Sequence, residues 1–236
     1  MQELTPPDNN SINVPWSMLD MALGVGALVL SFVVFLLVLH PLVTTEDEGL
    51  RVFQLVLLGS AIEGAPAYMV YRLAIKRYGV ARDALGFRRP RTRRNVLLVL
   101  GTVIGSLILI SMYGALVTQL EIDILIPEPI PEELRGNGIM RRALTAIAIA
   151  GFVPFVEEIF FRGFLFQGLA SKYGMIWGAA LSSALFALAH IVIGTMIPIF
   201  LIGLLFSLLY ARTGSLWMPI SAHATFNLVG LSVSGA

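Results

Sequence analysis

The sequence has no cysteine in 236 residues, which excludes disulfides, thiolate metal sites and a cysteine nucleophile. Charge is scarce as well: only 13% of the residues are Asp, Glu, Lys or Arg, against roughly 25% in a typical soluble domain. The net charge of +1 gives the chain no overall basic footprint for nucleic acid. With 57% hydrophobic residues, the composition predicts a membrane protein with several spans.

Several catalytic motifs are also missing. The chain has no His-Glu-x-x-His, no Gly-x-Ser-x-Gly and no glycine-rich phosphate loop. An intramembrane aspartyl dyad is excluded too, because no aspartate lies deep in an apolar segment. The five aspartates are Asp8, Asp20, Asp47, Asp83 and Asp123.

Long hydrophobic runs are what the chain does have. A membrane-spanning helix needs about 20 mostly apolar residues, and seven segments come close to this length. The fourth contains Gly151 and Pro154 and is long enough to hide a bend or break. We therefore predict an all-α bundle of about seven or eight transmembrane helices. The segments are about Ser17–His40, Leu50–Tyr71, Val96–Val117, Ala143–Leu169, Met175–Val192, Met196–Tyr210 and Leu216–Val233.

The domain prediction is a disordered tail over residues 1–15 and a single transmembrane domain over residues 16–236. The tail is polar and lacks the basic region of a cleavable signal. The connection from Arg72 to Arg94 holds nine basic residues and one acidic residue, so the positive-inside rule predicts that it is cytoplasmic. Counting back through two spans puts the N-terminus in the cytoplasm as well. Arg141 and Arg142 then fall on the outer side, against the rule. Beside membrane spans, this basic connection indicates orientation and attraction of anionic lipid rather than a nucleic-acid patch.

Three charged residues interrupt the fourth apolar segment, where a charge at mid-depth costs about 2.5–3.5 kcal/mol. Glu158 and Arg162 are four residues apart, so they share a helix face and are expected to form an ion pair. Glu157 points about 100° away and has no such cation in its own helix, which makes it the candidate general base. The alternative is that the cluster anchors a helix end at the interface, with Arg162 reaching for water.

Two further motifs place imidazole groups in apolar segments. Phe186 and His190 are four residues apart, and a lone histidine near a helix end is more often structural. His223 and Asn227 share a face of the last segment. They can bind a metal ion, donate two hydrogen bonds to one developing anion, or form a polar contact between helices. Occurring together with the glutamates, these motifs favour a shared, partly wet cavity.

In this order and on separate helices, the three motifs resemble the CAAX prenyl endopeptidase and bacteriocin-processing family of intramembrane proteases. The resemblance covers about residues 140–230 and includes the run Phe-Arg-Gly-Phe-Leu at 161–165. It implies that Glu157 and His190 activate a water molecule. It also implies that His223 and Asn227 stabilise the oxyanion.

The resemblance further implies that Glu158 pairs with Arg162 in a supporting role and that the cavity opens to the cytoplasm. Phe186, which precedes His190 by four residues in its motif, is a further predicted supporting residue. The residues leave the metal question open. Two histidines, a glutamate and an asparagine are enough to hold a divalent ion such as zinc, and they support a metal-free mechanism equally well.

The resulting prediction is an intramembrane endopeptidase whose partners are the lipid bilayer and a peptide or protein substrate, with or without a lipid, and not nucleic acid. One rival is a non-catalytic immunity or partner-binding membrane protein. A second is a proton-coupled transporter that uses the same residues as a relay, although no internal repeat is visible. A further acid in the second segment, Glu63, either lines the cavity or is paired near a broken helix.

Overall fold

The computed structural model describes residues 12–89, 93–127 and 138–233, and every regular element in these ranges is helical. The all-α prediction is therefore confirmed. The first eleven residues of the predicted disordered tail lie outside the described ranges. Ile12 and Val14 pack against the core, and Trp16 is buried in it.

The helices join into longer rods. The elements are α1 (Met18–Val34), η1 (Phe35–Leu39) and η2 (His40–Leu42); α2 (Glu48–Val70) and η3 (Tyr71–Lys76); η4 (Arg82–Leu85); α3 (Arg93–Gln119); η5 (Asp123–Leu125); α4 (Ile139–Ala146), η7 (Ile147–Phe152), α5 (Val153–Glu158), η8 (Ile159–Phe166) and α6 (Gln167–Tyr173); α7 (Met175–Ala189); α8 (Ile193–Thr213); and α9 (Trp217–Val233).

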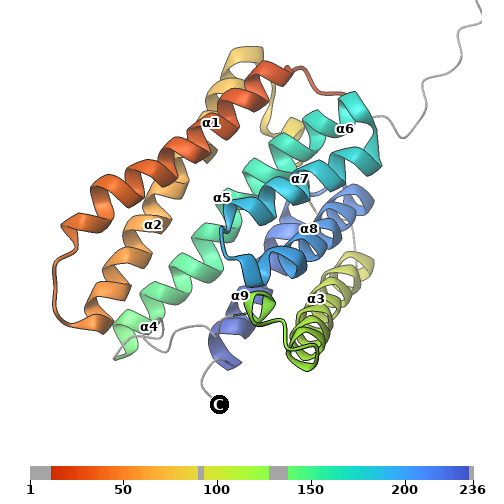
Figure 1. Cartoon of the computed structure of the whole chain (residues 1–236). Coiled ribbons are helices and arrows are strands. Elements are labelled where there is room, and N and C mark those ends of the chain that lie inside the picture. The colour runs from red at the N-terminus through yellow and green to blue at the C-terminus, as the bar shows by residue number, and fades with distance from the viewer. Residues whose placement is uncertain (1–11, 90–92, 128–137, 234–236) are drawn as a thin grey trace, which may run out of the picture.

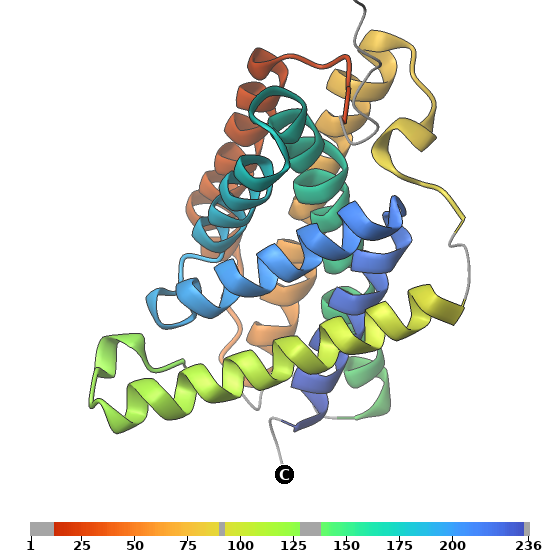
Figure 2. The ribbon, with the colours of Figure 1, turned by 90° about the vertical axis from the view of Figure 1, so that its right-hand side faces the viewer.

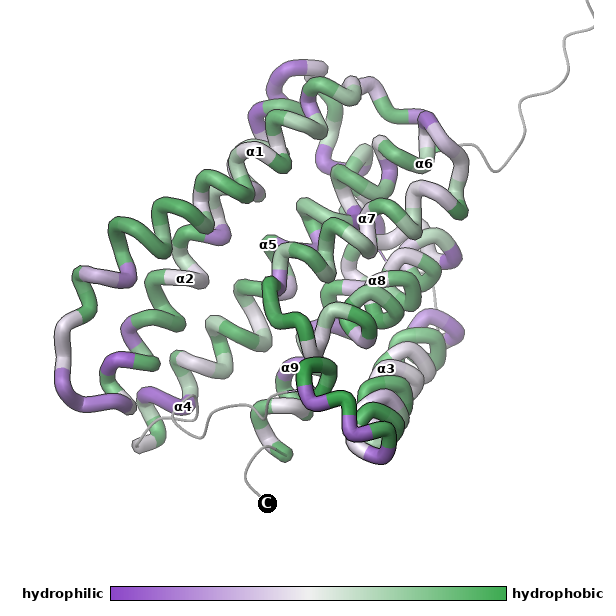
Figure 3. Tube along the Cα trace, in the orientation of Figure 1, coloured by the Kyte–Doolittle hydropathy of each residue, from purple (hydrophilic) through white to green (hydrophobic). Residues whose placement is uncertain are grey.

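Five rods in the described ranges are long and apolar enough to cross a bilayer, whereas α7 and α9, with 15 and 17 residues, are shorter. The chain is thus a multi-pass membrane protein. Hydrophobic residues run along the rods, and hydrophilic ones gather at many of their ends (Figure 3). The five rods are Met18–Leu42, Glu48–Lys76, Arg94–Gln119, Ile139–Tyr173 and Ile193–Thr213.

The fourth predicted segment is a single helix of 35 residues, Ile139–Tyr173, which we call the long helix. The predicted possibility of a break at Gly151 and Pro154 is not realised, so this part of the chain makes no additional crossing. Instead the helix widens into two π-helical segments, η7 and η8. Gly151 lies inside η7 and Pro154 is the second residue after it, so the local irregularity is absorbed by a wider turn.

Figure 1 shows α1 and α2 as an antiparallel pair, with the long helix beside α2. The chain then reverses at Gly174, whose φ of 84° favours glycine, and α7 packs back along α6. Gly178 permits this approach, because a Cβ there would lie 2.6 Å from the backbone nitrogen of Ala170. The helix α8 packs on α7, α9 packs against the long helix, and α3 covers α8 and α9 (Figure 2).

Backbone carbonyls in the two wide segments accept hydrogen bonds from side chains. Three of the donors come from other parts of the fold, and Gln167 belongs to the long helix itself. Since hydrocarbon offers no water to such groups, these bonds stabilise the irregular turns and hold neighbouring helices against them. The bonds are Asn227 Nδ2 to Ile149 O at 2.9 Å, Ser182 Oγ to Phe161 O at 2.8 Å, Gln167 Nε2 to Gly163 O at 2.7 Å, and Trp16 Nε1 to Phe164 O at 3.1 Å.

A buried aspartate joins the start of α1 to the end of the second rod. Ser17 caps α1, and the fully buried Asp20 completes its capping box. Arg77 Nη1 lies 2.7 Å from Asp20 Oδ1, and the Tyr78 hydroxyl donates to the other oxygen. The basic end of the second rod is therefore fixed to α1.

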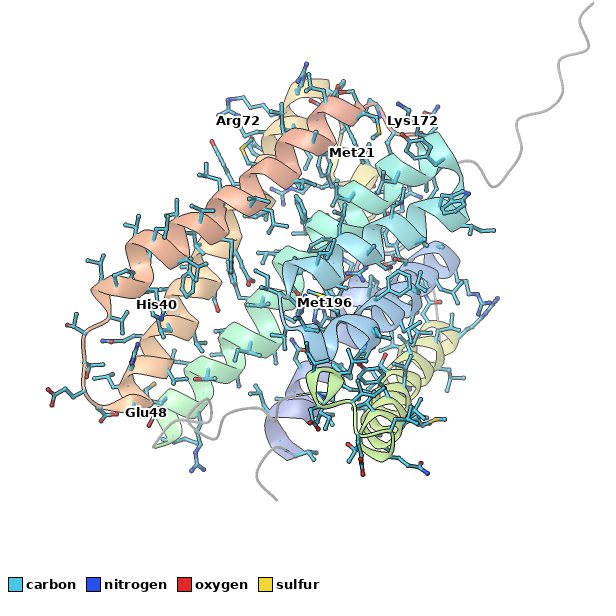
Figure 4. The ribbon with its side chains drawn as sticks, viewed as in Figure 1. Met21, His40, Glu48, Arg72, Lys172 and Met196 are labelled. Atoms are coloured by element: carbon cyan, nitrogen blue, oxygen red, sulfur yellow. The ribbon has the colours of Figure 1, made fainter. Side chains whose placement is uncertain are left out.

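Three labelled charged residues mark the two ends of the bundle. Arg72 and Lys172 lie near one end, and Glu48 lies near the opposite end (Figure 4). Arg141, which conflicts with the positive-inside rule, belongs to the acidic end: its Nη1 would lie 3.9 Å from a Cβ on Gly49.

Candidate active site

The predicted pair of Glu158 and Arg162 is present and buried. Arg162 Nη1 donates to Glu158 Oε1 at 3.0 Å, and both side chains have zero exposed fraction. A charge in such a position needs a partner of opposite sign to offset desolvation. The four-residue spacing supplies that partner within one helix turn.

Other helices complete the surroundings of the Arg162 guanidinium. Its Nη2 donates to the carbonyl of Gly203 on α8 at 3.1 Å. Its Cζ lies 4.4 Å from the ring centroid of Phe186 on α7 and 5.4 Å from that of Phe206 on α8. Phe186 was a predicted supporting residue, whereas Gly203 and Phe206 were not predicted. Aromatic faces attract a desolvated cation, so Arg162 connects the long helix to α7 and α8.

His223 lies between the two glutamates. Its Nδ1 is 3.0 Å from Glu158 Oε1, the same oxygen that accepts from Arg162, and its Nε2 is 3.7 Å from Glu157 Oε2. Because the buried carboxylate of Glu158 accepts, Nδ1 carries a proton. Nε2 then faces Glu157 favourably only when one of those two groups also holds a proton. At 3.7 Å the two groups are within ion-pair range but not hydrogen-bonded.

The two adjacent glutamates have different environments. The Glu157 side chain keeps a 15% exposed fraction, against zero for Glu158, although its Oε2 is buried and has no hydrogen-bond partner. Its nearest charged partner is the imidazole of His223 and not a guanidinium. Glu63 on α2 interacts electrostatically with Glu157 and has a buried, unpaired oxygen. This supports the cavity-lining alternative for Glu63.

His190 lies at the end of α7, beside the ring of Phe186. Its Nδ1 is 2.8 Å from the carbonyl oxygen of Phe186, and its ring centroid is 4.7 Å from that of Phe186. If Nδ1 donates to this carbonyl, Nε2 is left as an acceptor. Within the described ranges, no ion pair or hydrogen bond joins His190 to Glu157. The histidine beside Glu157 is His223.

Asn227 lies one turn beyond His223 on α9, as the spacing predicts. Its amide nitrogen donates to Ile149 O at 2.9 Å. A primary amide has two N–H donors, so the second remains available. The interhelical contact that was one of the alternatives for this pair is therefore present, and it leaves a donor free.

The side chains do not fit a zinc site as they stand. Among the described residues, no group of three or more His, Asp or Glu side chains is arranged to hold a metal ion. A catalytic zinc needs three protein ligands and an open position. The nitrogen and oxygen donors of the cluster are instead directed at one another or at backbone carbonyls, so we derive no step through a metal.

Fold and site define a class: a multi-pass helical membrane protein with glutamate, arginine and histidine side chains meeting inside the bundle. Residues 139–229 match the family described as type II CAAX prenyl endopeptidase Rce1-like. The resemblance inferred from the motifs is confirmed. The match covers the long helix, α7, α8 and most of α9.

Two curated relatives share part of the sequence. The protein of Bacillus subtilis (strain 168) named "Putative membrane peptidase YdiL" is 35% identical over 74 residues, 31% of this chain and 30% of that protein. An "Uncharacterized 24.3 kDa protein" of Escherichia coli is 34% identical over 93 residues, 37% of this chain and 43% of that protein. The chain thus matches less than half the length of either relative. No solved structure matches it significantly.

Proposed function

We propose that the protein is an intramembrane endopeptidase in which Glu157 activates a water molecule. The observation that carries this proposal is the difference between two adjacent glutamates: Glu158 is neutralised by Arg162, whereas Glu157 is partly accessible and faces an imidazole at 3.7 Å. A carboxylate with a proton-exchanging neighbour suits general-base work. The family match and the printed name of the Bacillus subtilis relative support the same reaction class.

The proposed reaction is a proton-balanced hydrolysis. A water bound between Glu157 and the free nitrogen of His190 loses a proton to Glu157 as its oxygen attacks the carbonyl carbon of the peptide. The carbon–nitrogen bond then breaks, and the proton passes from Glu157 to the leaving amine. One carboxylic acid and one amine result, and Glu157 returns to its starting state.

We assign oxyanion stabilisation to His223 and the free N–H of Asn227, because donors aimed at developing charge contribute most in a site that excludes water. Glu158 and Arg162 act on His223 as positioning residues: the Glu158 oxygen at 3.0 Å accepts from Nδ1 and fixes the ring orientation. His223 then donates to the oxyanion from Nε2, which requires the doubly protonated imidazole. The hydrogen bond from Asn227 to Ile149 O holds α9 against the long helix.

The proposal is tested by presenting a peptide library to the purified protein in lipid vesicles and identifying fragments by mass spectrometry. Wild-type protein is expected to produce fragments with new N-termini, each paired with a fragment that carries the new carboxylate. The matched control is Glu46→Gln. Glu46 is exposed and lies outside the glutamate–histidine cluster, so this variant should cleave peptides at the wild-type rate.

The rival functions predict other outcomes in these vesicles. A transporter gives proton-coupled uptake without fragments, and a partner-binding protein retains a peptide without cleaving it. Either result would reject the peptidase. The cleaved sequence and any lipid on the substrate are read directly from the fragments.

We also propose that the basic end of the bundle and the N-terminus are cytoplasmic and that the site opens to that side, on the positive-inside rule. Single cysteines at Glu46→Cys and Asp83→Cys test the orientation, since both positions are exposed and the native chain has no cysteine. With intact cells, an impermeant maleimide should label position 46 only, and position 83 should react after permeabilisation. The opposite pattern would invert the orientation, and labelling of both positions in intact cells would reject the topology.

A further inference from the structure

The basic end of the second rod contains an open groove of about 600 Å³. Two rows of side chains line it, each with four-residue spacing along α2 and η3. One row is Tyr68, Arg72 and Lys76, and the other is Met69, Leu73 and Arg77. Residues four apart on a helix lie above one another, so the groove follows the helix axis.

Of the three basic residues in this groove, one is held by a hydrogen bond to a tyrosine and another is paired with an acid. Arg72 donates from Nη1 to the Tyr68 hydroxyl at 3.1 Å and lies over that ring, 6.0 Å from its centroid. Arg77 is neutralised by Asp20. No ion pair with Arg72 or Lys76 occurs within the described ranges. Arg72 and Lys76 are therefore exposed cations without an ion-pair partner, and Arg72 is held in place by Tyr68.

Polarity changes along the groove in one direction. The outer end carries Lys76 and Arg77, and the inner end carries Met69 and the ring of Tyr68. The rod is one of the five that can span the bilayer, so the apolar end points towards the hydrocarbon and the basic end towards water. Cations at the headgroup level beside an apolar track match the two parts of a phospholipid.

We propose that this groove binds an anionic phospholipid, with its phosphate between Arg72 and Lys76 and one acyl chain along Met69 and Leu73. The Tyr68 hydroxyl accepts from Arg72, so its own proton is free to donate to a phosphate oxygen. This site is outside the glutamate–histidine cluster and does not depend on the proposed peptidase activity. An acidic peptide fits less well, because the apolar end of the groove lies within the membrane.

The test reconstitutes the full chain in nanodiscs of phosphatidylcholine with a minority of phosphatidylglycerol, and counts retained lipids by native mass spectrometry. Wild-type protein should retain phosphatidylglycerol in preference to phosphatidylcholine. In Arg72→Gln/Lys76→Gln this preference should fall about 25-fold, because each basic side chain near an anionic lipid contributes about fivefold in affinity.

The matched control is Lys172→Gln/Arg212→Gln, which removes the same charge from exposed positions outside the groove. It should keep the wild-type preference. Equal losses in both double variants would mean diffuse attraction and reject the site, as would equal retention of the two lipids. Displacement by inorganic phosphate alone would indicate a free-phosphate site and overturn the assignment to lipid. The single variant Lys76→Gln, at an exposed position, should lower the preference for phosphatidylglycerol about fivefold.

Discussion

Glu157→Gln is expected to lower kcat for peptide cleavage by about 10²-fold or more, the scale on which general bases contribute. Glutamine has almost the same size and keeps a hydrogen-bonding group near His223, but it cannot take a proton from water. Because the glutamate has no guanidinium partner, the substitution leaves no buried charge stranded. The unfolding temperature should therefore stay close to that of the wild type.

The measurement is cleavage of the best peptide from the library, with thermal unfolding of the same preparations. A variant that cleaves at nearly the wild-type rate would remove Glu157 from the mechanism. Glu158→Gln provides the contrast on the adjacent residue: it leaves Arg162 without its carboxylate and should unfold at a lower temperature. Identical behaviour of the two variants would contradict the division of roles between these glutamates.

Arg162→Ala is expected to cost about 3–5 kcal/mol of folding free energy, the range for breaking a buried ion pair from one side. The substitution strands the Glu158 charge at zero exposed fraction and removes the contact with Gly203 O. It also empties the space between the rings of Phe186 and Phe206. Expression and denaturant midpoint in detergent are the measurements, with the exposed Arg212→Ala as the control.

A second variant separates the lost pair from the lost volume. In Glu158→Gln/Arg162→Met no net charge is stranded, so part of the stability should return. A fully stable but inactive Arg162→Ala would give Arg162 a direct role in substrate binding or chemistry, and would contradict its assignment as a positioning residue.

The sequence predicted features governed by local spacing or by the bilayer. Segment boundaries followed from the length that hydrocarbon requires, and the pair of Glu158 and Arg162 followed from the helical repeat. The partner of Glu157 depends on how α7 and α9 are placed against the long helix, which spacing within a helix does not encode. The family resemblance implied that Glu157 and His190 act together on a water molecule, and it did not indicate that the His223 imidazole lies 3.7 Å from Glu157.

The contacts that sequence reasoning missed involve ordinary residues. Gly203 contributes a backbone carbonyl and Ser182 a hydroxyl, and neither residue type stands out in an apolar helix. Phe206 could have been suspected only as core. Asp20 was noted merely as outside the deep membrane, but its pattern with Ser17 is a capping signal that marks the start of α1.

The side chains that donate to the carbonyls of η7 and η8 come from different parts of the chain, so these hydrogen bonds form at different times during synthesis. Trp16 precedes this helix in the chain, whereas Ser182 and Asn227 follow it. N-terminal segments leave the ribosome first, so the carbonyls of Phe161 and Ile149 meet these partners only after α7 and α9 have been made. The long helix, which carries Glu157, Glu158 and Arg162, is thus translated before two of the side chains that bond to its carbonyls. Translation that stops before α9 leaves the long helix without both His223 and the donor to Ile149 O.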